Sequence, residues 1–174
     1  MGKPTRRERK VPTEETQLER TTQVYTWVMV PDFEPSGLLP SGIHLVTWAE
    51  LKSQFGFSQR RLALLEGLDL GLASLREAGC QTVYLDGSFA TAKVSPGDFD
   101  VCWELTGVDP ERLDPVLLEF SGGRAAQKEK YGGEFFPAEW AAVPDGTAYL
   151  EFFQTDKLSG ERKGILKLSL TENL

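Results

Sequence analysis

The sequence predicts an α/β (α+β) domain built on one small mixed sheet of four or five strands, with helices mainly on one face. Leucines recur at steps of three and four between about 59 and 78, which indicates a long amphipathic helix. Short apolar runs rich in strand-forming residues occur at 81–85, 98–105 and 164–170. The chain has 174 residues, a length that suits a single domain burying roughly two thirds of its unfolded surface.

The first part of that domain is expected to be a loop followed by two helices. Three prolines and two glycines between 31 and 44 predict an ordered loop, which ends near His44, the only histidine. Acid–base catalysis is one interpretation of His44, and a structural role is the preferred one. Thr47 and Glu50 have the spacing of a capping box, which predicts a short helix that ends at Gly56.

The second part should alternate helices with strands. Asp109-Pro110 favours a helix that restarts at Asp114-Pro115 and continues to 120. A polar helix is expected at 124–131, where Arg124 and Lys128 share a face because they are four residues apart. That face is either solvated or places two cations near a bound phosphate. The run 148–154 predicts a central strand that carries one charged residue, Glu151.

Composition limits the classes of function. The chain is 40% hydrophobic and 26% charged, and no apolar run approaches the roughly 20 residues of a membrane span. The N-terminal segment has no apolar core of signal-peptide type. Cys80 and Cys102 lack the spacing of a metal site and suit reduced, structural thiols. We therefore expect a cytoplasmic protein with no membrane partner.

The charge distribution is uneven. The net charge is −7, yet residues 1–30 contain six Lys/Arg and four Asp/Glu, against 13 and 22 in the remainder. Residues 1–28 are therefore predicted to form a flexible basic extension of a single domain at 29–174. The alternating stretch 23–28 is an alternative, because it suits an added edge strand. The acidic body is a poor general binder of nucleic acid, so any contact with RNA or nucleotide must be local.

Two polar motifs flank the strand ends in the middle of the chain. Gly87-Ser88 follows the apolar run 83–85, and a turn there offers N–H groups and a hydroxyl to a phosphate. Ten residues later comes Asp98-x-Asp100. Two carboxylates two apart on a strand point to the same face, and that crowding favours a bound cation. Mg²⁺ is the natural candidate, because it prefers carboxylate oxygens.

This pattern of Gly-Ser followed by Asp-x-Asp resembles the nucleotidyltransferase fold of the DNA polymerase β superfamily. Over roughly residues 30–170 the chain is also similar to small bacterial nucleotidyltransferase-like proteins, through Gly-Ile-His at 42–44, Tyr-Leu-Asp-Gly-Ser at 84–88, Phe-Phe-Gln-Thr-Asp at 152–156 and Lys-Gly-Ile at 163–165. Thr91-Ala92 and Pro96-Gly97 depart from the family pattern, which places the affinity for triphosphate in question.

The resemblance implies a set of roles for the site residues. Asp98 and Asp100 would hold up to two catalytic Mg²⁺ ions, with Glu151 as the third carboxylate and Asp156 as its substitute. Gly87 and Ser88 would cradle the phosphates of a nucleoside triphosphate (NTP). Further cations for the nucleotide are expected from Lys93, Arg124 and Lys128, although Lys93 suits an ordinary surface lysine equally well.

The resemblance also implies an activity, transfer of a nucleotide from an NTP to a macromolecule. Stand-alone relatives occur in toxin–antitoxin and phage-defence modules and modify tRNA ends or a partner protein, so we expect a tRNA or protein acceptor and a cognate toxin or antitoxin partner. The acceptor would be recognised by the basic extension, by the segment 124–131 or by that partner. One alternative is a catalytically degenerate fold that acts as an antitoxin or regulatory binding protein. Another is an enzyme that modifies a small hydroxylated antibiotic.

Overall fold

A five-stranded mixed sheet organises the chain, as the predicted fold class required. The computed structural model describes residues 30–171. The strands lie in the order β1-β5-β2-β3-β4, and β5 and β3 are each antiparallel to the central strand β2. The edge strands β1 and β4 pair in parallel with β5 and β3. Their bounds are β1 Gly42–Leu45, β2 Thr82–Asp86, β3 Asp100–Trp103, β4 Glu134–Pro137 and β5 Gly164–Ser169.

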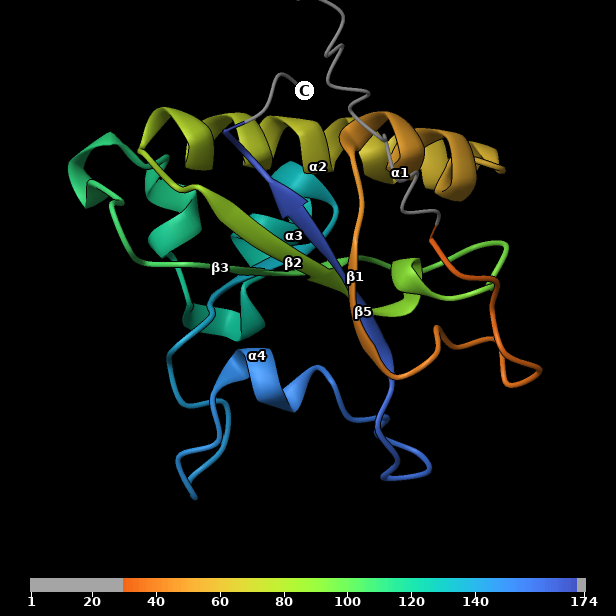
Figure 1. Cartoon of the computed structure of the whole chain (residues 1–174). Helices are drawn as coiled ribbons and strands as arrows, with labels where there is room; N and C mark the ends of the chain where they lie inside the picture. The colour runs from red at the N-terminus through yellow and green to blue at the C-terminus, as the bar shows by residue number, and fades with distance from the viewer. Residues whose placement is uncertain (1–29, 172–174) are drawn as a thin grey trace, which may run out of the picture.

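Of the four α-helices that residues 30–171 form, three lie on one face of this sheet (Figure 1). They are α1 (Trp48–Phe55), α2 (Gln59–Glu77) and α3 (Ala125–Tyr131), and they bury the larger hydrophobic core against the strands. The short α4 (Tyr149–Phe152) lies on the opposite face, where it covers a smaller aromatic core. Helix α1 begins with the expected capping box, in which the Thr47 and Glu50 side chains each accept a backbone N–H of the other residue.

The long helix α2 packs closely on its neighbours through two glycines. A Cβ atom on Gly67 would collide with the backbone of Tyr131, and one on Gly71 would collide with the ring of Phe135. These glycines cost helix stability, about 1 kcal/mol each relative to alanine, and in return they let α3 and β4 approach α2. The buried face differs from the expected row of leucines, because Leu62 is exposed whereas Arg61 and Leu64 are buried.

The predicted central strand at 148–154 is wrong, because these residues contain the one-turn helix α4. Its aromatic side chains pack on the sheet instead of joining it. The ring of Phe136 of β4 packs at an angle against those of Tyr149 and Phe153, with ring centroids 4.6 and 5.0 Å apart. A short, continuous apolar run suits a buried strand and a buried helix equally, so its periodicity could not decide between them.

Several smaller expectations also change. The first strand, β1, begins at Gly42, inside the segment 31–44 that was expected to be a loop. The helix expected from Asp109 to 120 is two separate 3₁₀ turns, Pro110–Arg112 and Pro115–Leu118, each started by an aspartate side chain that accepts a backbone N–H. Strand β3 is shorter than the predicted 98–105, so Asp98 precedes it.

Two further expectations concern the chain ends and the membrane. The predicted extension at 1–28 and its alternative strand at 23–28 lie outside the described residues. Between residues 30 and 171, none of the helices combines the length and the apolar character needed to cross a bilayer.

Candidate functional site

An acidic cleft opens where strands β2, β3 and β4 present carboxylates beside one another. It has a volume of about 480 Å³. One wall is the turn after β2, and the other comes from α4 and the segment that follows it. The charged residues that line this acidic cleft are Asp86, Asp98, Asp100, Glu134 and Asp156, together with Lys128, Lys157 and Lys163.

Three of these carboxylates form a row across the sheet. Asp86 is the last residue of β2, and it lies directly opposite Asp100, the first residue of β3. Asp100 in turn is paired with Glu134, the first residue of β4. Residues paired in this way on neighbouring strands point to the same face, about 5 Å apart. The register of the sheet therefore gathers three negative charges that lie far apart in the sequence.

This row shifts the acidity of its members. Burial, followed by the negative charges of Asp98, Asp86 and Glu134, raises the pKa of Asp100 to about 7. Burial likewise raises the pKa of Asp86, although the ion pair with Lys163 opposes that shift. When neighbouring negative charges raise the pKa of a carboxyl group, an added cation stabilises its charged form. The centre of the cleft therefore favours a further positive charge.

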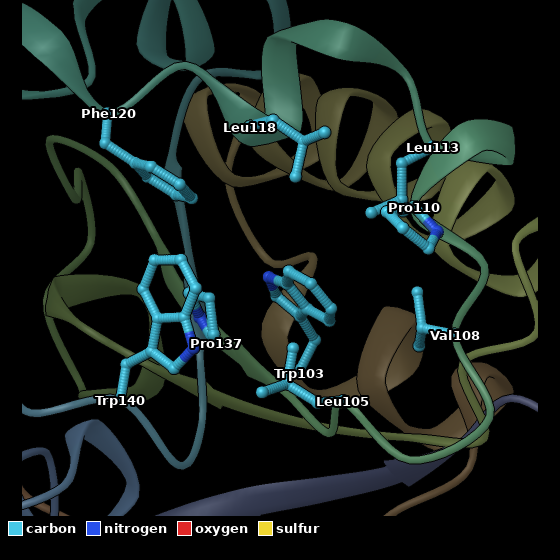
Figure 2. Close-up of a pocket in the computed structure, with 9 residues that line it drawn as sticks. All are labelled: Trp103, Leu105, Val108, Pro110, Leu113, Leu118, Phe120, Pro137 and Trp140. Atoms are coloured by element: carbon cyan, nitrogen blue, oxygen red, sulfur yellow. The ribbon is translucent and has the colours of Figure 1, made fainter.

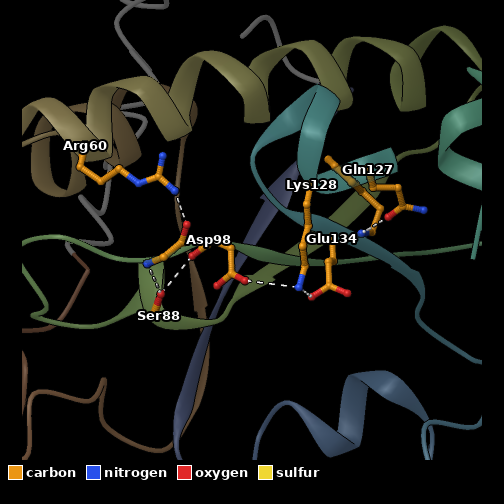
Figure 3. A network of polar contacts seen from close by, with 8 residues as sticks. Arg60, Ser88, Asp98, Gln127, Lys128 and Glu134 are labelled. Atoms are coloured by element: carbon orange, nitrogen blue, oxygen red, sulfur yellow. Dashed lines mark hydrogen bonds and ion pairs between the residues drawn. The ribbon is translucent and has the colours of Figure 1, made fainter. Parts of the chain in front are cut away.

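Besides Lys163, which pairs with Asp86, a second cation approaches the row: Lys128 of α3 (Figure 3). Its Nζ lies 3.0 Å from Glu134 and 3.8 Å from Asp98. The hydrogen bond to Glu134 raises the pKa of Lys128, so the lysine is charged. Its neighbour Gln127 is fully buried and fixes α3 to β4, because its Oε1 accepts the N–H of Phe135 at 2.8 Å. Lys128 is thus delivered to the cleft from a firmly attached helix.

The Gly87-Ser88 turn borders the row at the end of β2. Gly87 has φ +76°, and a Cβ atom there would lie 2.5 Å from Oδ2 of Asp100, so this position requires glycine. The Ser88 hydroxyl donates to the carbonyl of Asp98 and accepts the N–H of Gly97, both at 3.1 Å. The serine therefore ties the turn to the segment that carries Asp98.

Two adjacent arginines of α2 hold the loop that follows this turn. Arg61 is fully buried, and its guanidinium donates to the carbonyls of Phe89, Thr91 and Lys93, and to that of Phe55. Burial lowers the pKa of Arg61 to about 10. Arg60 is exposed and donates to the carbonyls of Pro96 and Gly97. The site loop is therefore fastened to the longest helix by side chain-to-backbone hydrogen bonds.

The structure gathers some of the predicted site residues and separates others. Asp98, Asp100, Gly87, Ser88, Lys128 and the substitute Asp156 all line the acidic cleft. Glu151 does not line it, because the strand expected to carry it is α4; its side chain is 59% exposed and pairs with Arg162. Lys93 is exposed outside the cleft and contributes its carbonyl to Arg61.

Two other candidates have structural contacts. Arg124 lies over the ring of Phe136, 4.0 Å from its centroid, and donates to the hydroxyl of Tyr149 at 3.2 Å. It therefore stiffens the aromatic core under α4 and does not line the cleft with Lys128. The ring of His44 is hydrogen-bonded to the carbonyl of Pro40 through Nε2 at 2.7 Å, which agrees with the preferred structural interpretation.

Sequence reasoning missed Glu134, Asp86 and Lys163 as members of the site. Glu134 carried a usable signal, since it is the charged residue between a glycine pair and the apolar residues 135–138. Asp86 was visible as the residue before Gly87. Lys163 was part of the Lys-Gly-Ile motif at 163–165, but no local pattern indicated its contact with Asp86, which joins positions 77 apart. Glu134 is the carboxylate that faces Asp100, the place assigned to Glu151 from the sequence.

The acidic cleft offers oxygen ligands of the kind that a magnesium site needs. Carboxylate oxygens of Asp98, Asp100 and Glu134 are the ligands that Mg²⁺ prefers. Within residues 30–171, no three His, Cys, Asp or Glu side chains are arranged to hold a metal ion as they stand. Between Asp98 and Glu134 lies the ammonium group of Lys128. These donors suit the ion by their chemistry, whereas their arrangement in the described structure is occupied by that lysine, whose side chain is 45% exposed.

Comparison with known proteins places the chain in a family without assigning it an activity. Neither the curated proteins nor the solved structures contain a match. A family model, described as a family of unknown function (DUF6932), matches residues 31–169, which is most of the chain and includes the whole sheet and the acidic cleft. The chain therefore belongs to this family of unknown function.

Proposed function

We propose that the acidic cleft binds a magnesium–NTP complex and transfers the nucleotide to a hydroxyl group of a macromolecule, such as a tRNA or a partner protein. The observation that carries the proposal is the row of Asp86, Asp100 and Glu134 beside the Gly87-Ser88 turn. A concentration of carboxylates next to a glycine turn suits the joint binding of a divalent cation and a polyphosphate. The resemblance of Gly-Ser followed by Asp-x-Asp to the nucleotidyltransferase fold supports the same chemistry.

The residues then take distinct roles. Asp98, Asp100 and Glu134 would hold Mg²⁺, which supplies charge neutralisation at the phosphates when it is bound. Lys128 would leave the carboxylates and pair with a phosphate oxygen, since one ammonium group can exchange one anion for another at low cost. Lys157 lines the same cleft and offers a second cation. Asp86 keeps its buried ion pair with Lys163 and positions the turn.

The proposed reaction is an in-line displacement at phosphorus. The acceptor oxygen bonds to the α-phosphorus of the NTP, and the bond from that phosphorus to the bridging oxygen breaks. Pyrophosphate leaves, and the proton of the acceptor hydroxyl passes to solvent. The protein contributes chiefly by positioning the groups and by neutralising charge, without a covalent intermediate on the chain.

Calorimetric titration with each NTP, with and without Mg²⁺, tests the proposal. We expect Mg²⁺-dependent binding that is lost when Asp98→Asn is combined with Asp100→Asn, and transfer activity reduced at least about 1000-fold. The fold should be retained, since burial and neighbouring charges already disfavour the charged form of Asp100. An active double variant would show that the chemistry takes place elsewhere.

A matched pair of glutamates separates the present assignment from the one made on the sequence. Glu134→Gln should weaken Mg²⁺-dependent binding by about 10- to 100-fold, because it removes a charge from the row. Glu151→Gln should leave binding unchanged, since Glu151 is exposed and pairs with Arg162. The opposite result would restore Glu151 as the third carboxylate.

The position of Lys128 favours a second candidate function. A lysine between Asp98 and Glu134 neutralises the carboxylates without a metal, which is the arrangement expected of a non-catalytic relative that binds a partner as an antitoxin or regulator. Lys128→Met distinguishes the two. In the catalytic protein this variant should bind Mg²⁺ more tightly and NTP more weakly. In a binding protein it should bind neither ligand and should lose stability.

A further inference from the structure

A second pocket lies at the other end of β3. It has a volume of about 190 Å³ and shares no lining residue with the acidic cleft. Its walls come from the segment after β3, from the two 3₁₀ turns and from the end of β4. We call it the tryptophan pocket, and the residues that line it are Trp103, Leu105, Val108, Pro110, Leu113, Leu118, Phe120, Pro137 and Trp140 (Figure 2).

One polar group in this pocket lacks a partner. Trp103 is 2% exposed, and within residues 30–171 its indole Nε1 has no hydrogen-bond acceptor. Figure 2 shows the indole nitrogen directed toward Leu118, Phe120 and Trp140. The nitrogen atom itself is covered, so a ligand oxygen reaches it only when the side chains around it shift. A buried N–H without an acceptor lowers stability by roughly 1–3 kcal/mol. A ligand that supplies one acceptor atom to this N–H would therefore be stabilised in the pocket.

The surroundings of that N–H select the kind of acceptor. None of the nine described residues that line the pocket is charged, and the wall opposite the indole is aromatic, with the rings of Phe120 and Trp140 5.4 Å apart. A water molecule needs two to four polar partners to be held stably, and these side chains offer very few. An apolar molecule that carries one oxygen acceptor would satisfy the N–H and still bury its body.

The volume of the pocket limits the size of the ligand that it can hold. An engineered apolar cavity of about 150 Å³ binds benzene, so a pocket of this volume suits a single substituted aromatic ring. Flat rings also pack well between the aromatic walls. We propose that the tryptophan pocket is a binding site for a small, uncharged aromatic ligand with a carbonyl or similar oxygen, which accepts a hydrogen bond from the Trp103 indole.

A pair of probes of similar size tests this site. Acetophenone has the carbonyl acceptor, and ethylbenzene lacks it. We expect acetophenone to bind the full-length ¹⁵N-labelled protein about 2- to 10-fold more tightly, the contribution of one hydrogen bond. It should also move one of the four tryptophan indole N–H resonances downfield. Equal affinity for both probes would overturn the proposal and indicate an occupant without an acceptor, such as an apolar side chain of a partner.

Variants assign the effect to one residue. Trp103→Phe should remove the resonance that moves and should abolish the preference for acetophenone. Trp48→Phe is the matched control, because Trp48 is also buried but lies on α1, outside the pocket; it should keep the preference. If Trp103→Phe does not fold, Val108→Trp fills the pocket and keeps the indole. An acetophenone shift that survives in Val108→Trp would contradict the proposed site.

Discussion

Strand β3 serves two sites that satisfy their polar groups in opposite ways. Asp100 begins the strand on the face that α4 covers, and Trp103 ends it on the face of the larger core. In the acidic cleft, lysines approach a surplus of carboxylates. In the tryptophan pocket, one donor has no partner among apolar walls. The binding proposed for the cleft requires Lys128 to leave its carboxylates, whereas the binding proposed for the tryptophan pocket breaks no ion pair and requires only that side chains uncover the indole N–H.

The largest change expected on the cleft side comes from Arg61→Met, which should lower the free energy of unfolding by about 3 kcal/mol. Its guanidinium donates to four backbone carbonyls that the variant leaves without this partner. Urea denaturation measures the loss. The neighbouring Arg60→Met removes two hydrogen bonds from an exposed side chain, one of them partly buried, and a loss of less than about 1 kcal/mol is expected. Similar losses for both variants would mean that Arg61 is not the main anchor of the loop.

A smaller effect is expected at the turn itself. Gly87→Ala should cost about 1–3 kcal/mol, since it places a side chain at φ +76° and against the carboxylate of Asp100. It should also weaken Mg²⁺–NTP binding and leave acetophenone binding unchanged, which separates the two sites. In Gly97→Ala the new Cβ atom meets nothing within 4 Å, so stability should stay within about 0.5 kcal/mol of the wild type. Equal losses of stability in Gly87→Ala and Gly97→Ala would show that neither the φ of Gly87 nor its contact with Asp100 determines the loss.

The smallest effect concerns the wall of the tryptophan pocket and its response to acid. Partial burial raises the pKa of Asp114, but hydrogen bonds from Lys130 and Tyr131 outweigh it and hold that pKa below its usual value. Asp114 therefore contributes stability that is full above about pH 4, the usual pKa, and is lost as the pH falls through the lower folded value.

Asp114→Asn tests that contribution. The variant should lose about 1 kcal/mol at pH 7, because the charged hydrogen bonds are weakened. Its free energy of unfolding should then fall less steeply than that of the wild type between about pH 5 and pH 3. Urea denaturation across that range provides the measurement. Parallel pH profiles for the two proteins would show that Asp114 contributes nothing through its charge.

Local patterns predicted the parts of this fold that local interactions determine. The leucine spacing of α2 and the capping box at Thr47 depend on neighbours within a few residues, and both are confirmed. The spacing of Gly87-Ser88 and Asp98-x-Asp100 likewise placed both motifs in one cleft. Whether the cleft performs nucleotide transfer remains a proposal.

The predictions that were wrong or incomplete concern structure that depends on contacts between distant segments. Strand β4 has only four residues and begins with a charge, so no alternating pattern marks it. Its parallel pairing with β3 puts Glu134 opposite Asp100, and no sequence spacing records that register. The run around Glu151 was assigned to the sheet because it is short and apolar. In the structure it forms a single helical turn that packs on the ring of Phe136, a contact that the sequence does not reveal. The third carboxylate was therefore sought on the wrong segment.

The strand order also has a consequence for synthesis on the ribosome. Strand β5 separates β1 from β2, although it is the last of the five to be made. Until residues 164–169 emerge, a nascent chain holds β1 and one edge of β2 without their shared partner. Because such long-range pairings form slowly, we expect the helices and the β2–β3 hairpin to assemble first. The sheet is completed only when β5 inserts between β1 and β2.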